Sequence, residues 1–438
     1  MSTGRRLTLL LVVLTLIGAP AFVLRAFCVG ESCAKAGPVS ASVPFCPLPS
    51  WLRDQIAAGF RDGRSPDVLA VTDDSTHVRE LGGTTWPSTA NVRRATEVPL
   101  LFMGPGIRGG ELSSGLALDR IAPTLEPLLG LRRTHPEVRA GAAIPGVVRE
   151  GSRSPLVVTI VWRAVGMPEL EARPDAWPWL ASRIEGATPD GAAGLAVPGS
   201  LPLDPAAVLT TIGSGGLPYQ HGITGTLLRG AGRVTRAWTA AAPPSVITTL
   251  ADDLDLANGQ ASRIGLVAPD IADRGLVGDG WYVGADHDDL RIGPGDPLPQ
   301  VERLLADGYG ADAIPDIVGI VLDGSLETMD RRTGAIVHAV TARVPDATIV
   351  VTATGSLRTA THALPGATIA RRLDAAMGAG VASAVGSDGV FLDPAVVTER
   401  RISSDQVASA LRRVTGPDGR PVVLDAYPSF SVAFARYC

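Results

Sequence analysis

The stretch PLVVTIVWRA at 155–164 decides the fold class. Its apolar and β-branched residues follow one another without the regular polar alternation of a strand that is exposed on one face. Such a strand is buried on both faces, as strands are in parallel sheets that carry helices on both sides. We therefore expect 155–164 to belong to a parallel sheet.

Other short apolar runs have the same character. They lie at 67–72, 98–104, 263–269, 317–323 and 347–354. Segments with helical spacing separate several of them, for example at 118–131, 245–254 and 333–344. Alternation of strand and helix predicts an α/β fold with a doubly wound, mostly parallel sheet, in which sites lie at the carboxyl ends of strands.

The composition fits a globular protein with many turns. The chain has 438 residues, of which 45% are hydrophobic and 19% charged, with 50 glycines and 35 prolines. This length allows two or three domains or one large one. Acidic and basic residues are interspersed and the net charge is −5, so no basic surface for nucleic acid is indicated.

Residues 1–27 have the pattern of an export signal. Two arginines precede an apolar run at 7–24. The tripeptide APA at 19–21 offers a cleavage site, while the run is near the lower limit for a membrane-spanning helix. We favour an uncleaved anchor with the protein facing outside the cell, and a secreted protein if the signal is cleaved. A juxtamembrane segment would follow at 28–64.

The four cysteines are Cys28, Cys33, Cys46 and Cys438. An even number in an oxidising compartment predicts two disulfides, with three possible connectivities. A bridge from the N-terminal cluster to Cys438 would tie distant parts of the chain together. A zinc site is the alternative, although no paired CxxC spacing is present.

The stretch TTIGSGGLPYQHGITGT at 210–226 is rich in residues that shape a backbone. Its glycines, among them Gly215, permit positive φ or a close approach of a ligand, and Pro218 fixes a turn. His221 continues the same loop-like pattern. The stretch is the floor of a site or an ordinary glycine-rich connection, and its local sequence leaves both open.

Two blocks carry a resemblance to a known family. LTTIGSGGLPYQHGITG at 209–225 is similar to the segment that follows the nucleophile in the alkaline phosphatase superfamily, particularly in its type I phosphodiesterase/nucleotide pyrophosphatase and sulfatase-like branches. EVPLLFMGPGIRGG at 97–110, with DRIAPTLEPLLGL at 119–131, resembles a late segment of that family. The resemblance implies an alkaline phosphatase-like fold.

The order of the blocks differs from that of the family. Residues 65–148 resemble its C-terminal part, yet they precede 155–356, which resemble its N-terminal and central core. This arrangement resembles a circular permutation, which an open sheet tolerates when the termini are neighbours. Residues 357–438 would form a C-terminal segment or small subdomain.

The family holds two divalent metals, usually zinc, with Asp and His ligands at strand ends. Its first-strand Asp-Gly falls at 163–165, where Arg163 stands, and its Asp-His-Gly falls on Ala-Thr-Gly at 353–355. Its Asp-x-x-x-His falls on Asp323 and Glu327. The resemblance therefore implies a degenerate metal site, because most of the anionic and imidazole ligands are missing.

The nucleophile segment of the family matches VPGSLP at 197–202, where Ser200 is the only hydroxyl. Ser200 is also interpretable as a turn or helix N-terminal residue before Asp204. The family's Asn after its HGI-x-G segment is Thr226 here. Gly215, His221 and Thr226 would line a substrate pocket, with a loop-structuring role as the alternative for His221.

Two further groups contain possible metal ligands. Asp73, Asp74 and His77 follow the expected strand at 67–72, as ligands should, or form a solvated loop. Asp-His-Asp-Asp at 286–289 has suitable donors, but it follows GWYVG rather than a β-branched strand, which favours a solvated acidic turn.

Two hypotheses follow. The first is a non-catalytic binding or scaffold protein of the cell envelope, with a partner in the envelope or a phosphate or sulfate ester as ligand. The second is a metal-dependent phosphoric or sulfuric ester hydrolase with Ser200 as nucleophile and zinc or manganese on an unusual ligand set. That set would comprise Asp323, Glu327, Asp73, Asp74 and His77. The number of missing ligands favours the first.

Overall fold

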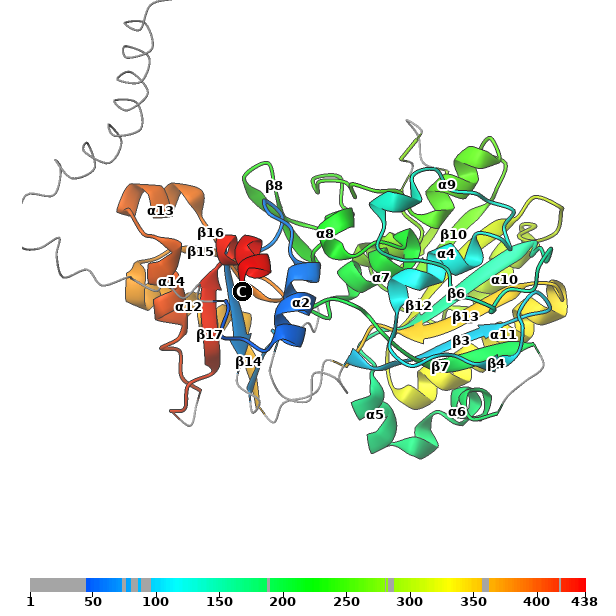
Figure 1. Ribbon diagram of the computed structural model, residues 1–438, viewed down its shortest axis with the longest axis horizontal. Coiled ribbons are helices and arrows are strands. Elements are labelled where there is room, and N and C mark those ends of the chain that lie inside the picture. The colour runs from blue at the N-terminus through cyan, green and yellow to red at the C-terminus, as the bar shows by residue number, and fades with distance from the viewer. Residues whose placement is uncertain are drawn as a thin grey trace, which may run out of the picture. The chain divides into compact units, whose positions relative to one another are not determined.

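The computed structural model describes residues 45–72, 76–79, 86–87, 96–186, 190–279, 281–282, 287–356, 362–416 and 419–438. Of residues 76–79, 362–363 and 436–437 it describes the backbone alone. Residues 44–438 form one compact unit, shown in Figure 1. No helix within the described residues is long and apolar enough to cross a membrane.

A large mixed sheet forms the main core. Its strand order is β11-β10-β12-β6-β13-β3-β7-β4, with β5 beside β7. The bounds are β11 Asp289–Ile292, β10 Ile264–Ala268, β12 Asp316–Leu322, β6 Leu156–Trp162, β13 Thr348–Ala353, β3 Val98–Met103, β7 Gly191–Val197, β4 Gly110–Glu111 and β5 Leu116–Ala117. The strands from β11 to β13 are parallel, and β3 is antiparallel to both of its neighbours. The expected α/β architecture with a largely parallel sheet is therefore confirmed.

Strand β6 contains the stretch that predicted the sheet. Each of its residues is buried, and it pairs in parallel with β12 and β13 along its length. Helices supply the remaining layers (Figure 1). They are α4 Ile121–Leu125, α5 Met167–Ala172, α6 Pro178–Ile184, α7 Pro205–Ser214, α8 Pro218–His221, α9 Leu250–Ala257, α10 Leu298–Ala306 and α11 Leu326–Arg343.

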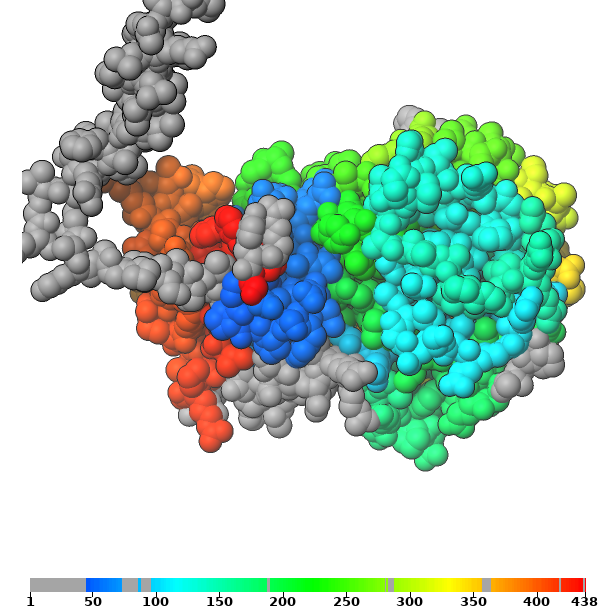
Figure 2. Space-filling model, viewed as in Figure 1, coloured from blue at the N-terminus to red at the C-terminus, as the bar shows by residue number. Residues whose placement is uncertain are grey.

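Shorter elements complete this part of the chain. The 3-10 helices are η1 Leu118–Arg120, η2 Pro136–Val138, η3 Pro174–Ala176 and η4 Ile271–Leu276, and β8 Leu227–Gly230 forms a hairpin with β9 Arg233–Arg236. Figure 2 shows the segment around α4, in cyan, as a continuous part of the surface.

A second, four-stranded antiparallel sheet has its own hydrophobic core. Its order is β15 (Ala382–Val385), β16 (Gly389–Leu392), β1 (Val68–Thr72) and β17 (Val423–Pro428). Helices α12 (Gly366–Met377) and α14 (Ser404–Leu411) contribute to this second core, and α13 (Pro394–Arg400) lies between them in the chain. Strand β2 (Thr76–Arg79) pairs with β14 (His362–Pro365). The run at 67–72 is thus a buried strand as expected, but it lies outside the main sheet.

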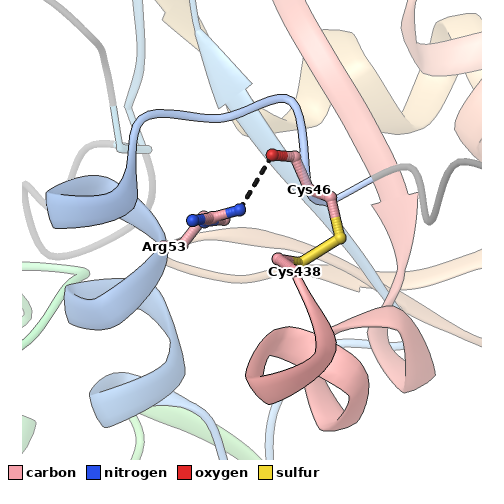
Figure 3. The surroundings of a disulfide bond; sticks show 3 residues. All are labelled: Cys46, Arg53 and Cys438. Atoms are coloured by element: carbon pink, nitrogen blue, oxygen red, sulfur yellow. Dashed lines mark hydrogen bonds between the residues drawn. A yellow bond between two sulfur atoms is a disulfide. The ribbon is translucent and has the colours of Figure 1, made fainter.

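A disulfide joins Cys46 to Cys438 across 392 residues (Figure 3). It links the segment before α2 (Ser50–Gly59) to the end of η5 (Ser429–Tyr437), and an Arg53 guanidinium donates to the carbonyl of Cys46 at 2.9 Å. The expected bridge from the N-terminal cysteine cluster to Cys438 is confirmed. The zinc alternative is wrong for this pair, while Cys28 and Cys33 lie outside the described residues.

Two local expectations need correction. The helix expected at 118–131 is only η1 followed by α4, because Pro127 has no N–H to continue the ladder and Gly130 turns the chain with φ 68°. The loop expected at 210–226 begins instead as the buried end of α7. Thr210 and Gly213 lie on α7 where it packs closely on η4: a Cβ on Gly213 would collide with the backbone of Gly275, and one on Gly275 with Thr210.

Candidate functional site

The carboxyl ends of β6, β12 and β13 meet at one edge of the main sheet. The N–H of Arg163, just after β6, donates to the carbonyl of Leu322 at the end of β12 at 2.9 Å. The N–H of Thr354, just after β13, donates to the carbonyl of Trp162 at 3.0 Å. The three segments that the family resemblance assigns to metal ligands are therefore adjacent.

An arginine occupies the end of β6. The guanidinium of Arg163 lies 3.3 Å from the carboxylate of Asp273 on η4, and the two side chains are 13% and 0% exposed. Burial raises the pKa of Asp273 to about 7, against the lowering effect of Arg163. The positive charge at this strand end is held by a buried acid, and a divalent cation beside it would be repelled.

Asp204 is the N-cap of α7 and is buried. Its carboxylate accepts hydrogen bonds from the N–H of Ala206 at 2.9 Å, from the N–H of Thr226 at 2.8 Å and from the hydroxyl of Thr226 at 2.9 Å. Burial raises the pKa of Asp204, and the hydrogen bonds from Thr226 oppose that rise. Thr226 thus fastens the glycine-rich stretch to the start of α7.

Ser200 lies in a bend and is 1% exposed. Its hydroxyl has no hydrogen-bond partner among the residues that the structure describes. The N-cap of the following helix is Asp204, so of the two structural interpretations of Ser200 the turn fits and the helix cap does not.

His221 is fully buried at the end of α8. The N–H of Ile223 donates to its Nδ1 at 3.1 Å, and its Nε2 lies 3.2 Å from the hydroxyl of Thr211. Because Nδ1 accepts, Nε2 carries the proton and donates to Thr211 in the neutral ring. Burial lowers the pKa of His221 to about 3. Gly215, the C-cap of α7 with φ 76°, is likewise engaged in shaping the backbone.

Asp323 and Glu327 are both exposed and have different surroundings. Asp323 follows β12 and lines a cavity at the sheet edge. Glu327, in the first turn of α11, lies 3.0 Å from the guanidinium of Arg173, with both side chains about half exposed. Across the described part of the chain, no three His, Cys, Asp or Glu side chains are grouped to hold a metal ion.

The remaining candidate ligands are only partly described. Asp73, Asp74 and Asp286 lie outside the described residues, and His77 is described only as backbone in β2. Asp289 begins β11 and accepts a hydrogen bond from the hydroxyl of Tyr309 at 2.9 Å.

Sequence reasoning missed a group of buried acids, Asp204, Asp273 and Asp388, in which the charge of Asp204 acts on the other two. Asp388, in the loop before β16, is 4% exposed, and burial together with the nearby charge of Asp204 raises its pKa to about 7. Gly225 lies between them: a Cβ there would come within 2.6 Å of the Ser387 hydroxyl and 3.1 Å of the Asp204 carboxylate. Only Asp204 had a local signal, as an acidic N-cap before Pro205.

Comparison with known proteins gives a limited result. No protein-family model and no curated protein matches the sequence. The chain is similar to the crystal structure of wild-type alkaline phosphatase PafA, with 12% identity and a TM-score of 0.42 over 60% of this chain and 77% of that chain. A mutant of the same enzyme matches with 13% identity and a TM-score of 0.41 over the same shares. A likeness at this level establishes neither the family nor an activity of this chain.

Proposed function

We propose that this chain is an extracytoplasmic protein with an alkaline phosphatase-like, degenerate metal site, and that it functions by binding rather than by hydrolysis. The observation that carries the proposal is the Arg163–Asp273 ion pair at the end of β6. Where the family resemblance asks for a carboxylate ligand, the chain has a cation whose partner acid is buried. A pair of metal ions at this strand end would lack that carboxylate ligand and would be repelled by the guanidinium.

The polar residues of the nearby segments support the same proposal. Asp204 and Thr226 bond to one another, and His221 uses both ring nitrogens within the fold. Buried groups with satisfied hydrogen bonds are costly to redirect towards a ligand. These residues therefore stabilise the sheet edge and do not form a first coordination sphere.

The proposal includes a permuted order of the segments. Strand β3, from the block that resembles a late part of the family, lies between β13 and β7 in the main sheet. Its place beside strands of 155–356 supports a sheet assembled from reordered segments. We further propose that 1–27 direct export, which the Cys46–Cys438 disulfide supports because disulfides persist in oxidising compartments.

The experiment measures metal content and turnover of the purified full-length chain. We expect metal well below one equivalent, and no turnover of nitrophenyl phosphate or bis(nitrophenyl) phosphate above buffer when zinc or manganese is added. Bound metal together with turnover that Ser200→Ala abolishes and Ser182→Ala retains would overturn the proposal. Ser182 is an exposed serine on α6 and serves as the matched control.

A further inference from the structure

A cavity of about 430 Å³ lies at the carboxyl ends of β10, β11 and β12. Its wall continues through the loop at 293–297 and the first turns of α10, and Arg332 of α11 also lines it. Ligands of open α/β sheets bind in crevices at this edge. None of Arg163, Ser200 or Asp204 lines the cavity, but Asp323, a candidate metal ligand, does, so the cavity adjoins the region described above.

The side chains that line this cavity include more positive than negative charges. Arg291, Arg303 and Arg332 contribute three positive charges, and Asp296 and Asp323 contribute two negative ones. The three arginines come from β11, α10 and α11, so three separate elements bring guanidinium groups to one space. The lining has a net positive charge and a high density of N–H donors, which suits an anion.

Two of these arginines have unused donors. The Nε atoms of Arg291 and Arg332 are buried and have no hydrogen-bond partner within the described residues. Arg332 Nε is 3.6 Å from a carboxylate oxygen of Asp296, and a terminal nitrogen of Arg291 is 3.8 Å from Asp289 and 3.9 Å from Asp307. These separations exceed hydrogen-bond length. A buried donor without a partner is destabilising, and pairing with a ligand oxygen would remove this cost.

The loop at 293–297 keeps the space open and supplies few donors of its own. Gly293 and Gly295 have φ 147° and 142°, and a Cβ on either would meet nothing within 4 Å. Pro297 has no N–H, and the N–H of Leu298 donates to Asp296 at 3.3 Å. The side-chain donors that line the cavity are therefore the arginines and the amide of Gln300, and the backbone at the start of α10 adds none at 297–298.

We infer that this cavity binds a phosphate group, free or carried on a larger ligand, between Arg291 and Arg332. Guanidinium forks match the oxygens of phosphate, and each charge-assisted hydrogen bond is about twice as strong as a neutral one. The inference does not depend on the loss of hydrolysis proposed above, because it rests on Arg291 and Arg332, which that proposal does not use.

The test titrates the full-length chain with inorganic phosphate in a calorimeter, at an ionic strength held constant with sodium chloride. We expect saturable binding that Arg291→Gln and Arg332→Gln each weaken about tenfold or more. Arg343→Gln removes a charge from the exposed end of the same helix and is expected to leave binding unchanged. Asp296→Asn removes the acid beside Arg332 and is expected to strengthen binding several-fold.

Absence of saturable binding to the wild-type chain would overturn the inference, as would an equal loss in Arg343→Gln and Arg332→Gln. Asp296→Asn keeps both arginines, so its effect remains measurable if an arginine variant fails to fold, and weaker binding by it would also count against the site. Parallel titration with glycerol phosphate distinguishes the two sources: tighter binding of the ester identifies a ligand-borne phosphate, and tighter binding of the inorganic ion identifies a free one.

Discussion

Arg163 and Asp273 show how one residue changes the chemistry of a strand end. The acid is fully buried, and its only described cationic neighbour within ion-pair distance is Arg163. Breaking a buried pair by removing one partner leaves an uncompensated charge, which costs more than the pair itself contributes. Arg163 is therefore needed for the stability of this strand end.

We predict that Arg163→Met lowers the free energy of unfolding by about 3 kcal/mol at pH 8. Without Arg163 the pKa of Asp273 rises further above its ordinary value, so more stability is lost as pH rises and the effect is smaller at pH 5. Urea unfolding at both pH values measures this. Arg173→Met breaks the exposed pair with Glu327 and should cost below about 1 kcal/mol; equal losses in the two variants would contradict the prediction.

Asp388 also has a raised pKa, but here a substitution that removes the charge should stabilise the protein. Its pKa in the folded chain is about 7, against 3.8 for the ordinary carboxyl. The contribution of this carboxyl group to the free energy of unfolding is therefore fully present below pH 4 and is lost as pH rises through 7. We expect Asp388→Asn to gain about 1–4 kcal/mol at pH 8 and nothing at pH 4. Thermal unfolding tests this against Asp62→Asn at an exposed site, and a gain independent of pH would refute it.

At the scale of elements, the contact between α7 and η4 decides how the glycine-rich stretch is used. A Cβ on Gly213 would lie 2.3 Å from the carbonyl oxygen of Gly275 and 2.7 Å from that of Leu276. These are backbone atoms, which cannot rotate away as a side chain can. Gly213 is therefore required by helix packing, whereas the sequence alone suggested a ligand-facing loop.

We predict that Gly213→Ala lowers the unfolding free energy by about 1–3 kcal/mol, since overpacking outweighs the gain in helix propensity. Alanine at an ordinary helical site is the more stable residue, so Ala375→Gly at an exposed position of α12 should cost about 1 kcal/mol. Urea unfolding of both variants gives the comparison. A Gly213→Ala variant as stable as the wild type would show that α7 can move away from η4.

At the scale of the whole molecule, the disulfide constrains the largest loop in the described chain. Cys46 and Cys438 are 392 residues apart, and a cross-link over a long loop lowers the entropy of the unfolded chain. Around the bridge, Phe45 and Tyr427 pack with ring centroids 5.0 Å apart. The bridge therefore joins segments that already share a buried contact.

We expect replacement of both Cys46 and Cys438 by serine to lower the unfolding free energy by about 2–4 kcal/mol. Thermal unfolding with and without reductant measures this: the wild-type chain should lose stability on reduction, and the double variant should not respond. A reductant effect of the same size in the double variant would assign the loss to another cysteine pair.

The sequence by itself determined the α/β class, the buried strands and some helix positions, such as that of α11, because uninterrupted β-branched runs and helical spacing are local patterns. It also predicted disulfides among four cysteines that include Cys46 and Cys438, although it left the pairing open. Only the tertiary structure decided that β1 belongs to the second sheet, since a buried run does not encode its partner strands.

The candidate site divides in the same way. Arg163 could be placed at a strand end from the sequence, because it directly follows an uninterrupted apolar run, and the ligand positions compared with it came from the family resemblance. Asp273 beside Arg163, Asp388 near Asp204, and the three arginines around the cavity come from segments far apart in the chain. Burial and charge pairing depend on which distant segments come into contact. Tertiary packing decides those contacts, and no local pattern in the sequence encodes them.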